Sequence, residues 1–287
     1  MDLQILAVPY DSGHRGARMG AGPERLLEAG IERALTDLGH RVRTTLVELP
    51  RDSWSSEIGA AFELMRRTAA AIAANKELLP IILAGNCNTS VGALAAHPPR
   101  TGIVWFDAHA DFNTPDTTTS GFLDGTALST VTGHSWRQLA LTVPGFRPVP
   151  EEGVCVVGAR DLDPLEERLL AESRVKVVGA VDIRSALSQA LDSIAAHVDR
   201  VHVHMDLDVL DASVARANSY AVGGGLTVED MEFALDLIGR RLTIAGVTLS
   251  AYDPTGDLDA RAASAAMRLI LAGVRAREHA PRSQRLA

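Results

Sequence analysis

Residues 102–111 read GIVWFDAHAD, a short apolar run that ends in acidic and imidazole side chains. The apolar part is typical of a buried strand. Asp107, His109 and Asp111 follow at every second position, and in extended backbone this spacing puts the three side chains on one side. A solvated loop with Asp caps is the alternative, but the donors directly follow an apolar strand. Because anionic and imidazole groups that converge on one point are unfavourable without a cation, the stretch predicts a metal site.

A second acidic pair, Asp206 and Asp208, ends another apolar run, residues 200–206 (RVHVHMD). An isolated D-x-D pair is common in turns. In a parallel sheet, however, the two acidic strand ends would meet at the same edge. Four carboxylates and one imidazole are too many hard ligands for one zinc ion and suit two divalent cations such as Mn²⁺. Two such ions can make hydroxide near neutral pH. We interpret His202 and His204 as packed or surface histidines.

The third cluster, AGNCNTSVG at residues 84–92, follows the apolar run 79–84 and contains Cys87. A free cysteine is usually a small buried hydrophobe. The polar neighbours of Cys87 favour a thiolate beside a metal instead, and both interpretations stay open on the residues alone. Cys155, within VCVV, is interpreted as core. Two cysteines cannot form a disulfide framework or a four-cysteine zinc site, so a reduced, cytoplasmic setting is expected.

Eight apolar runs alternate with amphipathic segments along the chain. They predict strands near 3–8, 43–49, 79–84, 102–106, 153–158, 174–178, 200–206 and 243–250. Helices are expected over 23–38, 56–75, 228–241 and 258–277, with Thr227 and Asp230 as an N-cap signal. The alternation predicts a mostly parallel sheet covered on both faces, in one domain of residues 1–287. Spacing alone allows an open sheet or a closed eight-fold barrel.

The composition excludes several functional classes. The chain has 287 residues and a net charge of −8, which disfavours a nucleic-acid or anionic-membrane surface. Its N-terminus has Asp2 and no basic region, so no signal peptide is expected. No uncharged apolar stretch is long enough to span a membrane. The polar residues from about 278 to 287 are expected to be a frayed tail.

With these motifs in place, the chain resembles the arginase/ureohydrolase superfamily over nearly its whole length. The resemblance is carried by YDSGHRGARMGAGPERL (10–26), DAHADFNTPDTTTSG (107–121), GARDLDPLEE (158–167) and HMDLDVLD (204–211). It implies an arginase-type three-layer αβα sandwich with an eight-stranded parallel sheet rather than a barrel. It also implies two Mn²⁺ ions, a small guanidino amino acid as substrate, and no nucleic-acid or membrane partner. The little chain after the last helix favours a monomer.

The resemblance also assigns roles residue by residue. Asp107 and Asp206 would bridge the two ions, and Asp111 would bind the first ion and orient the attacking hydroxide. His109 and Asp208 would complete the second ion. The α-carboxylate of the substrate would be held by Asn113, Thr118 and Ser120. Its α-amino group would be held by Asp163 and Glu166. Retaining both groups favours an amino acid over agmatine.

Four positions depart from the family pattern. Cys87 stands where a histidine ligand of the first ion is expected, and Asp124 stands where a histidine takes part in proton transfer. Phe122 replaces an asparagine of the carboxylate-binding loop, and Ala251 falls where an acidic residue meets the guanidinium. In its cysteine, the chain resembles the Nω-hydroxy-L-arginine hydrolases of D-cycloserine biosynthesis, which release hydroxyurea. Asp111, together with Asp124, would then pass a proton to the leaving amine.

Three hypotheses about function follow. The first is hydrolysis of Nω-hydroxy-L-arginine to hydroxyurea and L-ornithine, because a hydroxyguanidine is less basic and tolerates the loss of a carboxylate at Ala251. The second is an arginase or another guanidino-acid ureohydrolase. The third is a metal-binding pseudoenzyme that has lost its proton shuttle. Metal identity stays open, since a thiolate ligand favours softer ions such as Zn²⁺.

Overall fold

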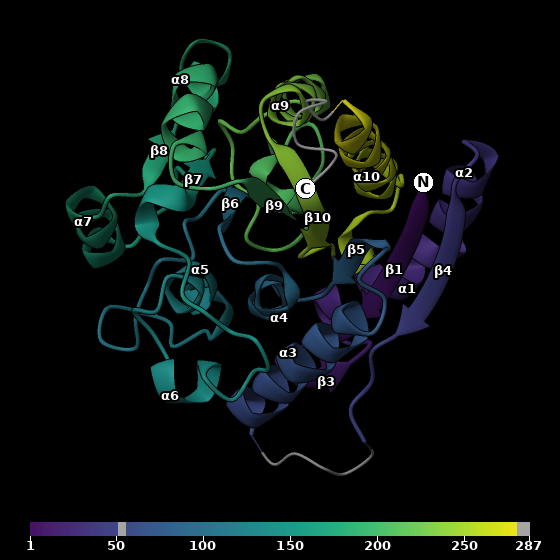
Figure 1. The fold of residues 1–287 in the computed structure, drawn as a ribbon, viewed down its shortest axis with the longest axis horizontal. Coiled ribbons are helices and arrows are strands. Elements are labelled where there is room, and N and C mark those ends of the chain that lie inside the picture. Colours follow the sequence, from purple (N-terminus) through teal and green to yellow (C-terminus); the bar gives the residue numbers. More distant parts are fainter. Residues whose placement is uncertain (51–55, 280–287) are drawn as a thin grey trace.

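The computed structural model describes residues 1–50 and 56–279, and its centre is one eight-stranded parallel sheet (Figure 1). In sheet order the strands are β4 (Arg41–Leu46), β1 (Asp2–Val8), β5 (Leu79–Ala84), β10 (Thr243–Ser250), β9 (Arg200–Asp206), β6 (Thr101–Phe106), β7 (Val154–Val157) and β8 (Lys176–Val178). All eight predicted strands are confirmed. Because β4 and β8 do not pair with each other, the sheet is open, which excludes the closed barrel.

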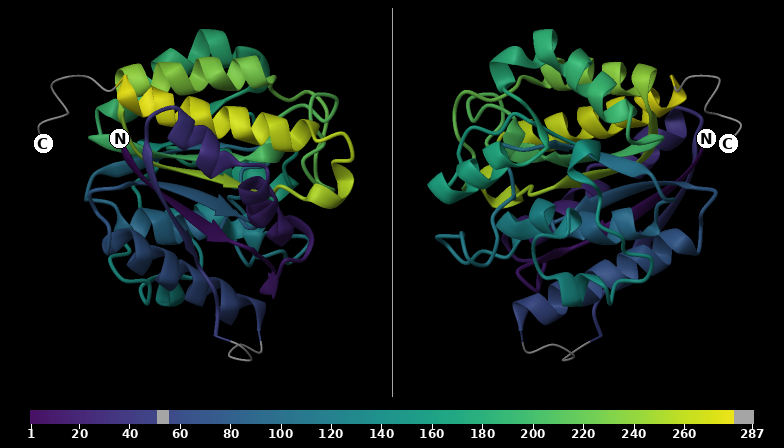
Figure 2. Two further views of the ribbon diagram at one scale, coloured as in Figure 1. Left: turned by 90° about the vertical axis from the view of Figure 1, so that its right-hand side faces the viewer. Right: turned by 60° about the vertical axis from the view of Figure 1, so that its left-hand side comes forward.

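Helices cover both faces of this sheet, as the two views in Figure 2 show. One layer contains α1 (Gly22–Glu28), α2 (Ile31–Asp37), α8 (Ile183–Ala195), α9 (Val228–Arg241) and α10 (Arg261–Glu278). The other contains α3 (Glu57–Ala73), α4 (Thr89–Ala96) and α5 (Ala127–Val131), with α6 (Arg137–Ala140) beyond them and α7 (Pro164–Glu172) near the β8 edge. The apolar cores lie between sheet and helices, and Cys155 is fully buried in one of them. The three-layer αβα architecture is therefore confirmed.

The predicted helix 23–38 is wrong as a single element. It is two helices, α1 and α2, separated at Ala29–Gly30, where Gly30 has φ = 91°. Glycine takes this left-handed conformation without the steric cost of a Cβ, so the chain turns there although the apolar spacing continues. The other predicted helices are confirmed, including the Thr227–Asp230 capping box of α9. Of the expected frayed tail, residues 280–287 lie outside the described residues.

The loops that carry the polar motifs follow four adjacent strands, β5, β10, β9 and β6. Since the strands are parallel, these loops leave the sheet at one edge. The N-terminal loop packs directly on the first of them, because a Cβ at Gly85 would lie 2.2 Å from the carbonyl oxygen of Tyr10. No helix in the described part of the chain is both long and apolar enough to cross a bilayer.

Candidate active site

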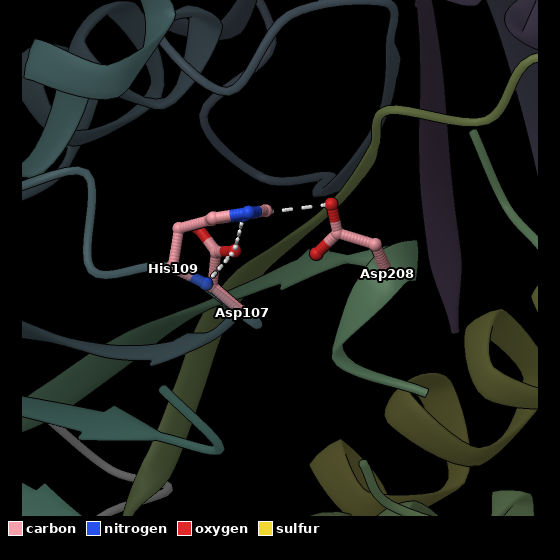
Figure 3. Close-up of side chains that lie close together, drawn as sticks. All are labelled: Asp107, His109 and Asp208. Atoms are coloured by element: carbon pink, nitrogen blue, oxygen red, sulfur yellow. Dashed lines mark hydrogen bonds and ion pairs between the residues drawn. The ribbon is translucent and has the colours of Figure 1, made fainter. Parts of the chain in front are cut away.

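Asp107, His109 and Asp208 converge at the ends of β6 and β9 (Figure 3). One ligand atom from each lies within 4.8 Å of the others, and His109 Nδ1 is 3.2 Å from Asp107 Oδ1 and 3.6 Å from Asp208 Oδ2. Burial opposes the charged form of His109, but Asp107 and then Asp208 raise the pKa of His109 to about 9. Burial and the charge of Asp107 raise the pKa of Asp208 to about 6. This group can hold one divalent cation.

Cys87 and Asp206, both predicted metal ligands, form a hydrogen-bonded pair close to the first group. Cys87 Sγ donates a hydrogen bond to Asp206 Oδ2 at 3.0 Å. Burial, reinforced by the neighbouring carboxylates, raises the pKa of Asp206 and of Asp111 well above the ordinary aspartate value. The same causes raise the pKa of the Cys87 thiol. These acidic groups are costly to ionise together unless a cation compensates them.

Asp111 supplies the clearest sign of a cation. Its Oδ2 atom is buried and has no hydrogen-bond partner among residues 1–50 and 56–279. Such an orphaned carboxylate oxygen is rare and calls for an ion or water beside it. Oxygen donors with one imidazole and one thiol(ate) fit divalent ions between hard and borderline. The residues present therefore fit the metal that their spacing predicts.

Two residues of the site have a left-handed backbone conformation: Asp111 with φ = 51° and Ala251 with φ = 61°. This conformation is energetically unfavourable for residues other than glycine, so contacts with the surrounding structure must stabilise it. The carbonyl oxygen of Asp111 accepts hydrogen bonds from the N–H groups of Leu128 and Ser129, at the start of α5. The carbonyl oxygen of Ala251 accepts one from Asn218 Nδ2 at 2.9 Å. Hydrogen bonds thus stabilise two strained positions of the site, one in the loop after β6 and one directly after β10.

A cavity of about 270 Å³ opens onto these donors. Its lining brings together all the predicted metal, catalytic and substrate-binding residues except Asp107, which is fully buried: Cys87, His109, Asp111, Asn113, Thr118, Ser120, Asp124, Asp163, Glu166, Asp206 and Asp208. Phe122 and Ala251 line it as well. Among the described residues of the lining, none is a lysine or an arginine. The cavity is therefore strongly acidic and suits cationic groups.

Asp124 is held on both carboxylate oxygens by the loop that contains Cys87. It accepts hydrogen bonds from Asn86 Nδ2 at 2.9 Å, Cys87 N at 2.9 Å and Asn88 N at 2.7 Å. Burial nevertheless raises the pKa of Asp124 to about 7. The contacts show that Asp124 anchors the backbone around Cys87. Its part in proton transfer stays a prediction.

The predicted substrate-binding residues are already bonded to one another. Asp163 accepts hydrogen bonds from Asn113 Nδ2 at 3.1 Å and from Thr119 Oγ1 at 2.9 Å. Glu166 accepts from the N–H groups of Phe112 and Asp163, which makes it the capping-box residue of α7. Burial raises the pKa of Glu166 to about 7. These contacts fix the loop that contains Asn113 against the start of α7.

Two further lining residues, Asn218 and Tyr220, have no counterpart among the predicted residues. Asn218 Nδ2 contacts Asp208 Oδ2 at 3.3 Å, and Asn218 Oδ1 accepts from Tyr220 N at 2.8 Å. The Tyr220 ring stacks on Phe122, with centroids 5.7 Å apart and planes at 19°, and meets His109 edge-on at 6.5 Å. The sequence places both residues only in an irregular stretch after a strand. Their approach to the cavity depends on long-range packing.

Comparisons with known proteins agree with this geometry. The sequence model of the family described as "Arginase family" matches residues 1–274. The arginase of Bacillus caldovelox is 27% identical over 289 residues, which span 93% of this chain and 96% of that protein. The solved arginase of Bacillus cereus superposes with a TM-score of 0.85 at 22% identity, over 96% of this chain and 98% of that one. A formimidoylglutamase from Bacillus subtilis has a TM-score of 0.76 at 19% identity, over 98% and 88%. Both superpositions show that this chain shares its fold with these proteins.

Proposed function

This chain belongs to the arginase family, and from that premise we propose that it hydrolyses Nω-hydroxy-L-arginine to hydroxyurea and L-ornithine. It is a ureohydrolase, an enzyme that acts on the C–N bonds of linear amidines. The observation that carries the finer proposal is the chemistry of the cavity wall. Cys87 lies among the metal donors, and Ala251 presents only a methyl group where a carboxylate would pair with a guanidinium.

The other carboxylates of the cavity do not replace the missing one. Asp124 is bonded to the Cys87 loop, Asp163 to Asn113 and Thr119, and Glu166 to backbone N–H groups. Apart from the candidate metal donors, Asp161 is the one remaining carboxylate among the described lining residues, and its side chain is 60% exposed. A fully charged guanidinium would therefore lack a buried partner at the Ala251 wall, which is unfavourable.

A hydroxyguanidine is less basic than a guanidine, so it reaches the cavity more readily as a neutral group. A neutral head costs less to bury against the methyl group of Ala251. The enzyme would then discriminate against arginine because no carboxylate at position 251 pairs with the charged guanidinium. Asp163, whose carboxylate can accept more than its two present hydrogen bonds, would hold the α-ammonium group, and Asn113 with the nearby hydroxyls would hold the α-carboxylate.

The residues of the chain divide the chemistry among them. Two divalent ions, held by Cys87, Asp107, His109, Asp111, Asp206 and Asp208, would lower the pKa of a shared water so that hydroxide forms near neutral pH. Asp111, with its unpartnered Oδ2, can hold the attacking water by a hydrogen bond and then carry a proton to the leaving amine. Asp124 keeps Cys87 in place and is the second candidate for that proton.

Arginine or a guanidino acid of another length is the second candidate substrate. The Phe122–Tyr220 stack favours it, because an aromatic wall accepts a longer or shorter alkyl chain as well as a flat head. Both candidates use the same acidic cavity and the same donors.

A reconstitution assay tests the proposed function. The protein is dialysed against a chelator, reloaded with Mn²⁺, and incubated with Nω-hydroxy-L-arginine, L-arginine, agmatine and guanidino acids of different lengths. Hydroxyurea and ornithine are expected as the main products, and only after metal is restored. An Asp206→Asn variant, treated identically, controls for contaminating hydrolases. Absence of turnover on every guanidino compound would show a pseudoenzyme and overturn the proposal.

A further inference from the structure

Behind Cys87 lies a chain of buried polar side chains that does not line the cavity. Ser250 Oγ is 3.2 Å from Cys87 Sγ, and it also meets His204 Nε2 in a longer contact of 3.4 Å. The other ring nitrogen of His204, Nδ1, is 2.8 Å from Ser90 Oγ. Ser90, His204 and Ser250 are all fully buried. Polar groups this deep are costly unless each finds a partner, so the chain is a specific arrangement.

The directions of these hydrogen bonds follow from the groups themselves. A thiolate sulfur that binds a metal can only accept a hydrogen bond, so the Ser250 hydroxyl must donate to it. The Ser250 oxygen then accepts from His204, which places the proton of the neutral imidazole on Nε2. His204 Nδ1 is left as an acceptor for the Ser90 hydroxyl. A single assignment therefore satisfies the whole chain from Ser90 to Cys87.

Trp105 locks the histidine in this orientation. The rings of Trp105 and His204 stack with centroids 3.5 Å apart and planes at 14°, on paired residues of β6 and β9. Trp105 Nε1 also donates to Asp107 Oδ2 at 3.0 Å. The same buried unit thus contacts Cys87 at one end and Asp107 at the other, and both are candidate metal ligands.

We propose that Ser250 and His204 are positioning residues for Cys87, which orient its sulfur and restrain its electron donation to the metal through a directed hydrogen bond. The proposal rests on the proposed function in one respect, namely that Cys87 is a metal ligand. Hydrogen bonds to a ligand from outside the coordination sphere commonly change metal affinity by about 10–100-fold. His204 therefore has a role beyond filling the core.

Cobalt(II) is the probe, because a cobalt–thiolate bond gives a sulfur-to-metal charge-transfer band. The metal-free protein titrated with Co²⁺ should show this band, and Cys87→Ser should abolish it. Ser250→Ala should move the band to longer wavelength, because a thiolate without its hydrogen bond donates more strongly to the metal. It should also weaken Co²⁺ binding about tenfold or more, because the sulfur is no longer oriented towards the metal. His204→Phe keeps an aromatic ring against Trp105 but cannot donate, so it should shift the band in the same direction. Ser250→Thr keeps a hydroxyl group at this position, so its band should lie at the wild-type wavelength.

Thr248→Val is the matched control. Thr248 lies two residues from Ser250 on the same strand, is fully buried, and contacts the buried ring of His202 at 2.8 Å without touching a metal donor. It should leave the band unchanged. A Ser250→Ala spectrum identical to that of Thr248→Val would overturn the proposal, as would a wild-type complex without the band. Turnover is measured separately, so a shifted band without hydrolysis would contradict the proposed function and leave the positioning role supported.

Discussion

The thiol of Cys87 lies 3.0 Å from a carboxylate oxygen of Asp206 and donates its hydrogen bond to it. The two residues are 119 positions apart in the chain and meet at the ends of β5 and β9, which are separated in the sheet only by β10. In the metal-free protein they share a proton that a cation must displace. Metal binding at this site therefore competes with protons.

Asp206→Asn should lower metal content and activity together. Asp206 is expected to donate to both ions, and an amide oxygen is a much weaker ligand than a carboxylate. Metal analysis of the purified variant beside its kcat on hydroxyarginine checks this. Full activity at full metal occupancy would refute its role as a bridging ligand.

Cys87→Ala should weaken the binding of one metal ion more than that of the other. The variant leaves Asp107, His109 and Asp208 intact, so one binding event should persist in a calorimetric Mn²⁺ titration. The second should weaken by more than about tenfold, because a donor is lost outright. Two binding events of unchanged affinity would remove Cys87 from the ligand set.

The metal-free protein should become less stable as the pH rises from about 7.5 to 9. The raised pKa of His109, about 9, and those of Asp111 and Asp206 mean that the folded state holds more protons than the unfolded chain. A group with a raised folded pKa contributes stability that is full below its unfolded pKa and is lost as the pH rises through its folded pKa. The buried histidines with lowered pKa are neutral in both states in this window: His97, His202 and His204. Urea unfolding in chelator at both pH values checks the sign, and a stability that rises with pH would contradict it.

Asp124→Ala should destabilise the fold by about 1–3 kcal/mol, because the buried N–H groups of Cys87 and Asn88 lose their acceptor. Asp161→Ala is the control, since Asp161 lines the same cavity but is exposed, and its loss should cost no more than about 0.5 kcal/mol. Urea denaturation compares the two. Equal stability of both variants would show that Asp124 does not anchor the loop.

Tyr220→Ala should raise the KM for hydroxyarginine and change kcat less. The stack with Phe122 forms part of the cavity wall, and an aromatic pair of this kind contributes about 0.5–1.5 kcal/mol, which corresponds to roughly a 2- to 12-fold change in binding. Tyr220→Phe keeps the ring and should resemble the wild type in steady-state kinetics. If Phe impaired binding as much as Ala, the hydroxyl rather than the stack would be responsible.

Local spacing was sufficient to predict the strands, and it placed Asp107, His109 and Asp208 in one candidate metal site. The expectation that Asp107, His109 and Asp111 share one side of an extended strand is wrong in its geometry, because β6 ends at Phe106 and Asp111 has φ = 51°. The strand end places Asp107 and His109 beside Asp208, and the turn of the loop brings Asp111 to the same cavity. The break at Gly30 escaped prediction, because Leu26, Leu27, Ile31 and Leu35 keep helical spacing across it. Whether a glycine bends a helix depends on its φ, which the apolar pattern does not report.

The remaining features of the site depend on contacts between distant segments. Tyr220 reaches Phe122 and His109 only through the path of the loop that Asn218 ties to Asp208. His204 is buried, as expected of a packed histidine, but its contact with Ser250 requires the pairing of β9 with β10. No local sequence pattern encodes such pairings, so the roles of these residues could be inferred only from the structure.

The most direct test of the substrate assignment compares kcat/KM for Nω-hydroxy-L-arginine and L-arginine on the same Mn²⁺-loaded protein. We expect a clear preference for hydroxyarginine, because Ala251 offers no carboxylate to a charged guanidinium. Ala251→Glu should shift that ratio towards arginine. A clear preference of the wild-type protein for arginine would contradict the account.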